Sequence, residues 1–418
     1  MFKFLNGWIK CFSDSARCAE WLAAGNKYYV AGDYVRANKY YCKILRRRPH
    51  DFSALCNHAA ASLFLKDYDA AKTGANTLIK NFPQQACGWS LRGRALLEEG
   101  GCAAAVDDLQ QAVRLDAADC WNYNYLAQAL QKCGRRNDAA EAALRAVEIS
   151  GGEDSQQLNL AYTLYENSLE DGAASVHGIL QKWHEKYPQN PIAEQSWKSF
   201  FYDENYTKPD ARYVEKVFDS FAASFDETLL NLEYDSPRKI AEILFRNFKP
   251  DSAVRYQILD LGCGTGLCGR ALDSLFKKRF LTGIDLSAPM LEKARAKRCY
   301  DRLLKAEIEQ YLSQADERFD VVVSADVLTY FGALDKLFSR VHSVLNDGGC
   351  FAFSATRNGV NEKDYFLHPS GRFIHAEKYL ENRLQKNGFR IVEKVDSVLR
   401  KEGENDVCGW IFLATKNI

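Results

Sequence analysis

The sequence predicts two domains: an N-terminal α-solenoid of helical repeats, then a doubly wound, Rossmann-like α/β sheet with an antiparallel last strand. Three observations predict this architecture. Apolar segments alternate with helical patterns after residue 250, and the first of them runs into a glycine-rich turn. Two final strand-like segments are too close together for a parallel crossover. Alanine recurs every 34 residues in the first part of the chain, at Ala37, Ala71, Ala105, Ala139 and Ala173.

Length and composition limit the classes of function. At 418 residues the chain is long enough for two or three domains. Its 55 basic and 55 acidic residues give a net charge of zero, so we expect no nucleic-acid partner. The thirteen cysteines include no Cys-x-x-Cys pair, which favours a reducing, cytoplasmic compartment and no metal site. No apolar run approaches the ~20 residues that span a bilayer, so we expect no membrane partner.

The domain boundaries follow from these patterns. The middle of the segment between the two domains has a helical pattern with Trp197, Phe200 and Phe201 on its apolar side. We expect this segment to pack against both domains, since so many exposed aromatic side chains would be unusual. The expected parts are an N-terminal capping helix at 1–17, a repeat array at 18–187, a helical linker at 188–211 and the α/β domain at 212–418.

The first part of the chain repeats a helix–turn–helix unit about five times. A second set of small residues lets the paired helices approach closely, and it recurs with the same period at Gly25, Ala59, Gly93, Ala127 and Ala161. The period and these residues resemble tetratricopeptide repeats. That resemblance implies a groove that binds a protein or peptide partner. A rigid spacer is the alternative.

One class of partner is testable residue by residue. Tetratricopeptide domains that clamp the C-terminal carboxylate of chaperones use two asparagines and three basic residues. Asn26 and Asn57 occupy the asparagine positions, but Leu22, Cys87 and Leu91 stand where the basic residues belong. A carboxylate bound there would lose its charge-assisted partners. We therefore expect that the repeats are not a chaperone-tail clamp.

The first strand of the α/β domain ends in three alternating glycines, Gly262, Gly264 and Gly266. Glycine lets a ligand approach the bare backbone, and the N-terminus of the next helix favours an anionic group. The segment 264–269 also matches the dinucleotide pattern GxGxxG. However, Asp260 on the last turn of the strand would repel a pyrophosphate and suits a ligand with an ammonium group. Of the two candidate ligands, Asp260 favours S-adenosylmethionine over a dinucleotide.

A second acid, Asp285, ends the next strand 19 residues after Gly266 and can accept both hydroxyls of a ribose. The segment that follows it, 285–295, resembles class I S-adenosylmethionine-dependent methyltransferases. The resemblance implies that Asp285 holds the ribose, that Met290 packs on the adenine, and that Glu307 meets the adenine amino group. A plain core position for Met290 is the alternative.

The remaining strands extend this resemblance over roughly residues 212–418. The continuous apolar run 319–325 is typical of a strand covered on both faces. The final strands, near 390–398 and 409–415, are joined by the polar loop 400–406, which requires an antiparallel pair. The methyltransferase sheet has such a reversed last strand, and the common dinucleotide fold lacks one. The resemblance therefore implies S-adenosylmethionine as the cofactor.

Candidate catalytic residues come from the segments after the fourth strand. Asp326 and Tyr330 follow that strand at its carboxyl end, where ligands bind in open α/β sheets. Arg372 and His375 belong to a second motif, and Leu399-Arg400-x-Glu402 is a third. Together the motifs resemble bacterial proteins that join tetratricopeptide repeats to this methyltransferase domain. His375 would serve as a general base, or it has only a structural role beside the next helix.

Three functions agree with these observations. We expect an enzyme that methylates a protein or carrier-bound acceptor recruited by the repeats, because a small metabolite needs no groove of this size. A small-molecule O- or N-methyltransferase, whose repeats govern assembly or localisation, is the second hypothesis. A non-catalytic scaffold with a relic donor site is the third, and the intact acids Asp260, Asp285 and Glu307 argue against it.

Overall fold

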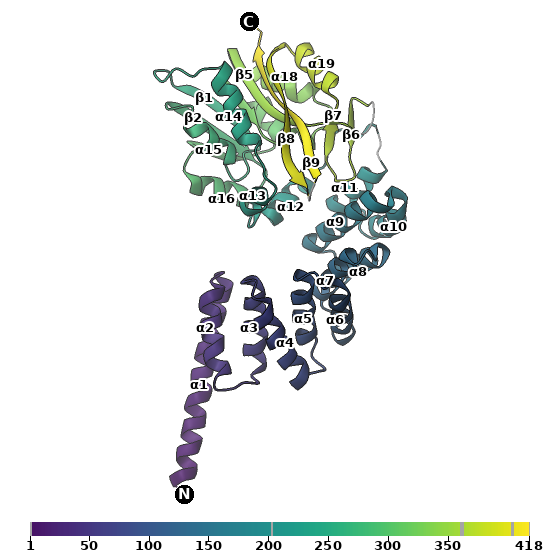
Figure 1. Ribbon diagram of the computed structural model, residues 1–418. Coiled ribbons are helices and arrows are strands. Elements are labelled where there is room, and N and C mark those ends of the chain that lie inside the picture. Colours follow the sequence, from purple (N-terminus) through teal and green to yellow (C-terminus); the bar gives the residue numbers. More distant parts are fainter. Residues whose placement is uncertain (1, 202–203, 360–362, 403–404, 418) are drawn as a thin grey trace. The chain divides into compact units, whose positions relative to one another are not determined.

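The computed structural model describes residues 2–201, 204–359, 363–402 and 405–417, with side chains from residue 15 onward. The chain divides into two compact units, Met1–Trp183 and His184–Ile418 (Figure 1). The expected linker at 188–211 belongs to the second unit. No helix in the described ranges is both long and apolar enough to cross a membrane.

The first unit consists of paired helices. The first pair is α1 (Phe2–Val30) and α2 (Tyr34–Leu45). The next three pairs are α3 (Phe52–Phe64) with α4 (Tyr68–Asn81), α5 (Ala86–Glu98) with α6 (Cys102–Leu115), and α7 (Cys120–Lys132) with α8 (Arg136–Ile149). Helices α2, α4, α6 and α8 begin 34 residues apart, so the period of the sequence is also a period of the structure. Residues 2–17 do not form a separate capping helix, because they continue directly into the first repeat helix as α1.

Small residues let the helices of a pair cross closely. A Cβ atom at Gly25 would lie 2.6 Å from the ring of Tyr41, and one at Gly93 would lie 2.7 Å from Cγ of Leu109. Any larger side chain at these positions would push the two helices apart. At these two positions the small residues therefore lie where the paired helices cross, as predicted.

The last pair of the first unit departs from the pattern. Helix α9 (Asp154–Asp171) has 18 residues, more than any of α2 to α8, and is followed by Gly172, whose φ is +82°. A short 3₁₀ helix, Ala173–Val176, leads into α10 (His177–Lys186). Trp183 is fully buried and donates its indole N–H to Gln157 at 3.0 Å, which ties α10 to α9.

The second unit is a seven-stranded sheet covered by helices. Four helices precede the sheet: α11 (Pro191–Phe200), α12 (Ala211–Phe221), α13 (Phe225–Asn231) and α14 (Ser236–Asn247). The strands are β1 (Tyr256–Leu261), β2 (Arg279–Asp285), β3 (Arg302–Lys305), β4 (Phe319–Ser324), β5 (Leu345–Thr356), β8 (Phe389–Glu402) and β9 (Asn405–Lys416). They lie in the order β3-β2-β1-β4-β5-β9-β8. A separate hairpin pairs β6 (Tyr365–Leu367) with β7 (Phe373–His375).

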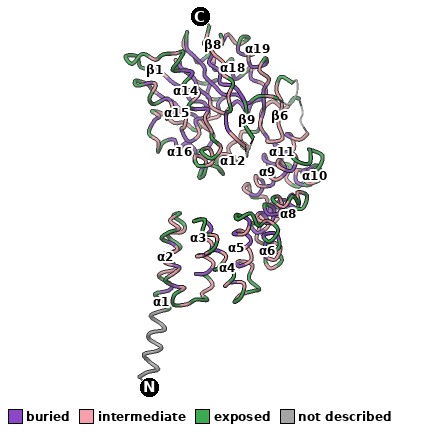
Figure 2. The backbone as a smooth tube through the Cα atoms, viewed as in Figure 1, coloured by how far each residue is buried: buried purple, intermediate pink, exposed green. Residues whose placement is uncertain are grey.

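Helices cover both faces of the sheet, and side chains that alternate along each strand feed two cores. Helices α14 and α15 (Leu267–Asp273) pack on one face, where Ile258 and Val321 point. Helices α17 (Ile308–Gln314), α18 (Asp335–Val344) and α19 (Glu377–Lys386) pack on the other, where Leu259 and Val322 point. Helix α16 (Ala288–Lys297) follows β2, and a 3₁₀ turn, η2 (Leu328–Tyr330), follows β4. Figure 2 shows buried residues along the strands of this unit.

The final strands form the expected antiparallel pair, but they are longer than the sequence suggested. Strand β9 runs antiparallel to both β5 and β8, so the prediction of a reversed last strand is confirmed. The predicted polar loop at 400–406 is wrong in extent, because Arg400 to Glu402 and Asn405 onward are strand residues. Residues 403 and 404 lie outside the described ranges. The pairing of β9 with β5 ends at Gly409, but β8 and β9 continue to pair with each other as far as Glu402 and Asn405.

Candidate active site

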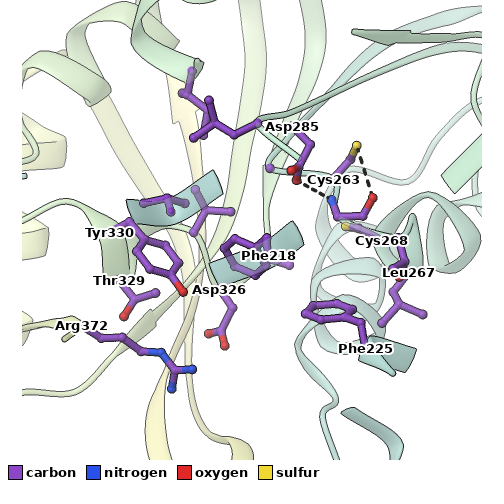
Figure 3. Close-up of a pocket in the computed structure, with 18 of the residues that line it drawn as sticks. Phe218, Phe225, Cys263, Leu267, Cys268, Asp285, Asp326, Thr329, Tyr330 and Arg372 are labelled. Atoms are coloured by element: carbon purple, nitrogen blue, oxygen red, sulfur yellow. Dashed lines mark hydrogen bonds between the residues drawn. The ribbon is translucent and has the colours of Figure 1, made fainter. Parts of the chain in front are cut away.

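A pocket lies at the carboxyl ends of β1, β2 and β4. Helices α12 and α13 contribute one wall through Val214, Phe218, Phe225 and Leu229. Figure 3 shows two groups of side chains on opposite sides of this pocket: Thr329, Tyr330 and Arg372 on one side, and Cys263, Leu267 and Phe225 on the other. The first group belongs to the candidate catalytic segments, and the second surrounds the glycine turn. The pocket therefore has two chemically different ends.

The three glycines of the turn have different neighbours. All three have positive φ, at +67° for Gly262, +53° for Gly264 and +89° for Gly266, which favours glycine at each position. A Cβ at Gly262 would lie 2.4 Å from Val327, and one at Gly266 would lie 2.9 Å from the ring of Tyr300. Only Gly264 faces space, because its nearest neighbour is 3.9 Å away. Gly262 and Gly264 line the pocket, and Gly266 does not.

Asp260 lies beneath the turn rather than in the pocket wall. Only 1% of the residue is exposed, and burial raises the pKa of its carboxyl to about 7. The hydroxyl of Tyr300 donates to Oδ2 at 2.6 Å, whereas Oδ1 is buried without a hydrogen-bond partner. Sequence reasoning placed this acid against the ligand and did not identify Tyr300, whose ring fills the space behind the turn. The structure thus leaves Asp260 adjacent to the pocket with one unpaired oxygen.

Asp285 lines the pocket and organises the turn. Its two carboxylate oxygens accept hydrogen bonds from the backbone N–H of Gly264 and of Ser287, both at 2.8 Å. Burial raises its pKa, and these backbone bonds offset part of the rise. Ser287 caps α16 by accepting from the N–H of Met290. Met290 is fully buried in the core and does not line the pocket, which fits the core alternative for this residue.

Glu307 lies on the pocket wall at the start of α17. Its carboxylate caps that helix by accepting from the N–H of Gln310 at 2.7 Å. The ammonium group of Lys208 lies 2.7 Å from Glu307 and 3.0 Å from Glu309. Burial opposes the charged form of Glu307, but Lys208 and the helix amides hold its pKa below the usual range. Local sequence patterns did not identify Lys208, because it lies 99 residues from Glu307 along the chain.

Polar contacts hold helices α12 and α13 over the glycine turn. Asp226 accepts from the hydroxyl of Thr265 at 2.5 Å and pairs with Lys297 at 2.6 Å. Asp219 accepts from the hydroxyl of Ser287 at 2.6 Å. Phe218 and Phe225 line the pocket, whereas Phe221 is exposed.

The opposite end of the pocket is a cluster of charged side chains. Arg400 donates to Oδ2 of Asp326 at 2.6 Å and to Oε1 of Glu402 at 2.9 Å, and it is almost fully buried. Asp326 has a φ of +60°, which strains a residue with a side chain, and its Oδ1 is buried without a partner. The sequence pattern included Arg400 and Glu402 in a motif but did not predict that they line the pocket. Charged residues close to a chain reversal are typical of an exposed loop.

Arg372 reaches the same cluster from the turn between β6 and β7. Its Nη1 donates to Oε1 of Glu402 at 2.6 Å, so this one oxygen serves both arginines. Burial opposes the charge on Arg372, but Tyr330, Glu402 and Asp326 raise its pKa overall. Burial also opposes the charge on Glu402, and the two arginines still lower its pKa. Within the described part of the chain, Nε and Nη2 of Arg372 have no hydrogen-bond partner.

His375 is not brought to the pocket. It is fully buried on β7, and its Nε2 lies 2.8 Å from the carbonyl oxygen of Phe331. Burial lowers the pKa of the imidazole to about 4, so the ring is neutral at ordinary pH. This environment fits the structural alternative better than a general base. Asp326, Tyr330 and Arg372 do line the pocket, and no three potential metal ligands gather among the described residues.

Comparisons with known proteins agree on one family. A family model described as a methyltransferase domain matches residues 258–349. The chain is 30% identical over 202 residues to malonyl-[acyl-carrier protein] O-methyltransferase of Geobacter sulfurreducens, covering 45% of this chain and 73% of that protein. It is 32% identical over 148 residues to the protein of the same name from Legionella pneumophila, covering 34% of this chain and 52% of the relative.

Solved structures include a magnesium protoporphyrin IX methyltransferase from Synechocystis with bound SAH. That protein is 16% identical, with a TM-score of 0.38, and the match covers 50% of this chain and all of the other. The matched segment spans about half of the Legionella relative's length. All of these matches cover part of the chain, and the family model lies within the second unit.

Proposed function

The chain belongs to the S-adenosylmethionine-dependent methyltransferases, and we propose that its second unit methylates a carboxylate oxygen of an acceptor held on a carrier or another protein. The single observation that carries this proposal is the free edge of Arg372. Its Nη1 is bound by Glu402, its Nε and Nη2 have no hydrogen-bond partner among the described residues, and its side chain lines the pocket. These two groups form the side of a guanidinium that binds both oxygens of a carboxylate.

The names of the relatives support an acceptor of this kind. The Geobacter and Legionella proteins are named as O-methyltransferases of malonyl-[acyl-carrier protein]. A malonyl group bound as a thioester ends in a free carboxylate. The edge of Arg372 suits that group, and Tyr330 and Thr329 lie beside it in the pocket wall.

The residues at the other end of the pocket fit S-adenosylmethionine. Gly264 leaves its backbone open to a ligand, and Asp285 and Glu307 place two carboxylates on the wall for polar groups of the nucleoside. The carboxyl group of Asp260 lies beneath the turn, where a negative charge would favour a cationic group in the adjoining pocket. Phe218 and Phe225 add aromatic faces, which attract a cation. When bound, the cofactor supplies a methyl group on a cationic sulfur, which bonds to the acceptor oxygen as the bond to sulfur breaks.

Methylation of a carboxylate needs no general base among these residues. The carboxylate oxygen is already deprotonated at neutral pH, so no side chain has to remove a proton. This agrees with the position of His375, which is buried away from the pocket. The task of Arg372 is to orient the carboxylate, and that of α12 and α13 is to exclude water. Orientation alone supplies a large part of the acceleration in such sites.

The proposal is tested with the purified full-length protein and labelled S-adenosylmethionine. We expect label in a malonyl thioester and none in the acetyl thioester, which lacks the carboxylate. The product should release labelled methanol in alkali, as a methyl ester does. Label in the acetyl thioester, or a label stable to alkali, would contradict carboxylate methylation. No methylation of either thioester would remove the malonyl group as the acceptor.

Substitution of Arg372 sharpens this test. Arg372→Ala should lower kcat/KM for the malonyl thioester roughly 100-fold, since two charge-assisted hydrogen bonds are lost. Arg246→Ala is the matched control, because Arg246 also pairs with one glutamate at 2.6 Å but lies outside the pocket lining. Equal losses in the two variants would argue against a role for Arg372 in binding.

We further propose that the first unit is a tetratricopeptide array that recruits the protein bearing the acceptor, in the cytoplasm. The 34-residue spacing of its helices supports the array, and the twelve cysteines with described side chains are all free thiols, as in a reducing compartment. The full-length protein should then have a lower KM for a malonyl group on a carrier protein than for a malonyl thioester of a small thiol. Equal KM values would contradict recruitment.

A further inference from the structure

The turn that carries Arg372 has little support of its own. It joins β6 and β7, which are only three residues each. The backbone N–H of His368 donates to the carbonyl of Arg372 at 2.9 Å, and the N–H of Gly371 donates back to His368 at 2.9 Å. The hairpin meets the main sheet through a bridge between Arg357 and His375, and His375 lies three residues beyond Arg372. The position of Arg372 therefore depends on what packs against this turn.

Helix α11 packs against it from outside the sheet. Nε2 of Gln195 donates to the carbonyl oxygen of Gly371 at 2.8 Å, immediately before Arg372 in the chain. The hydroxyl of Ser199, one turn further along α11, donates to the carbonyl of Ser196 at 2.7 Å and also lies 3.4 Å from the carbonyl oxygen of Pro369. Gln195 and Ser199 are 1% and 2% exposed, so these are interior contacts.

The amide of Gln195 has a defined orientation. Its Oε1 accepts a hydrogen bond from the hydroxyl of Tyr206, so its Nε2 is the group that faces Gly371. Gly371 itself has a φ of +78°, and a Cβ there would lie 2.9 Å from the hydroxyl of Tyr213 on α12. The turn is thus in contact with both α11 and α12.

We propose that Gln195 is a positioning residue for the acceptor: by holding the Gly371 carbonyl, it fixes where the free edge of Arg372 points. Gln195 does not line the pocket and touches no acceptor. It acts only through the backbone of the residue that precedes Arg372. The inference rests on the proposed function, because it assigns the consequence to binding of the acceptor carboxylate.

Two variants separate the hydrogen bonds of Gln195. Gln195→Glu keeps an oxygen for Tyr206 but loses the donor to Gly371, and Gln195→Met loses both bonds at similar volume. In either variant we expect KM for the malonyl thioester to rise about tenfold, because a buried carbonyl loses its partner. We expect kcat to change less than about twofold and the affinity for S-adenosylmethionine to stay the same, since the glycine turn is untouched.

Gln157→Met is the matched control. Gln157 is equally buried and also donates its Nε2 to a glycine carbonyl at 2.8 Å, that of Gly152, but it belongs to the first unit. Its loss should leave KM for the small malonyl thioester unchanged. A similar rise of KM in both variants would overturn the proposal. So would equal losses of kcat and donor affinity in the Gln195 variants, which would indicate general damage to the fold.

A second readout keeps the inference testable if the malonyl thioester is not a substrate. Phenylglyoxal modifies accessible arginines, and peptide mass mapping gives the rate at Arg372. The side chain of Arg372 is 37% exposed, so it is open to the reagent. The rate at Arg372 should change several-fold in Gln195→Met and stay the same in Gln157→Met. Equal rates in the wild type and Gln195→Met would overturn the positioning role, whatever the acceptor is.

Discussion

The hydroxyl of Tyr300 donates a 2.6 Å hydrogen bond to Oδ2 of Asp260 directly beneath the glycine turn. The same ring lies against Gly266, Gly269 and Gly283, where any Cβ would come within 3 Å of it. The second oxygen of Asp260 has no partner. Only one oxygen of this buried carboxyl group therefore has a hydrogen-bond partner. Its ionisation makes the stability of the unliganded protein depend on pH.

Asp260 should destabilise the unliganded protein as pH rises. Its pKa is about 7 in the folded state against 3.8 in an unstructured chain, so the folded state binds more protons between these values. Stability therefore falls from about pH 4 to about pH 7, at about 1.4 kcal/mol per pKa unit. Asp260→Asn imitates the protonated form and should remove this fall. Calorimetry without cofactor should show a larger gain in melting temperature at about pH 8 than at about pH 5. Equal gains at both pH values would contradict the raised pKa.

Two glycines of the turn should respond differently to the same substitution. Gly266→Ala places a methyl group against Tyr300 and should destabilise the protein by about 2–3 kcal/mol, from the positive φ together with overpacking. Gly264→Ala meets no close neighbour, so its loss of stability should be smaller, but the methyl group enters the pocket. Denaturant unfolding measures the first effect, and calorimetric titration with S-adenosylmethionine measures the second. The prediction is wrong if Gly266→Ala is the milder variant in unfolding.

Asp285→Ala should weaken binding of S-adenosylmethionine at least about tenfold. The substitution removes a pocket carboxylate and also frees the amides of Gly264 and Ser287, which lose charge-assisted bonds. Asp347→Ala is a suitable control, because Asp347 is exposed and pairs with Lys416 outside the pocket. Titration calorimetry measures the affinity of both variants for S-adenosylmethionine. An unchanged affinity in Asp285→Ala would remove this residue from the cofactor site.

A partly buried ion pair in the first unit should matter for stability alone. Arg92 makes two hydrogen bonds of 2.7 Å to Asp108, which is 6% exposed. Asp108→Ala leaves the arginine without its charged partner and should cost about 3 kcal/mol. The affinity for S-adenosylmethionine should not change, since its site lies in the second unit. A weaker affinity in this variant would reveal coupling between the two units.

Local signals predicted the part of the site that is contiguous in the sequence. The glycine turn, Asp285 and the reversed last strand depend on spacing within short segments, and each lies where the pattern placed it. Met290 could not be assigned in this way, because the same N-capped helix places its side chain either in the pocket or in the core. Packing against the rest of the α/β core decides that choice, and the sequence does not display it.

Patterns within short segments of the sequence could not predict contacts between residues far apart in the chain. Lys208 meets Glu307 across 99 residues, and Arg400 meets Asp326 across 74. Charged residues at 400–402 looked like a loop because no neighbour in the sequence neutralises them. In the fold, Asp326 and Arg372 supply the missing partners, so a buried charged strand end becomes stable.

The two ends of the pocket are built from different parts of the chain. Gly264, Asp285 and Glu307 follow the first three strands, β1 to β3, whereas the charged cluster comes entirely from residues 326–402. Under the proposed function, substitutions in the segments after β4 would therefore change the acceptor and leave the residues proposed to bind the cofactor unchanged.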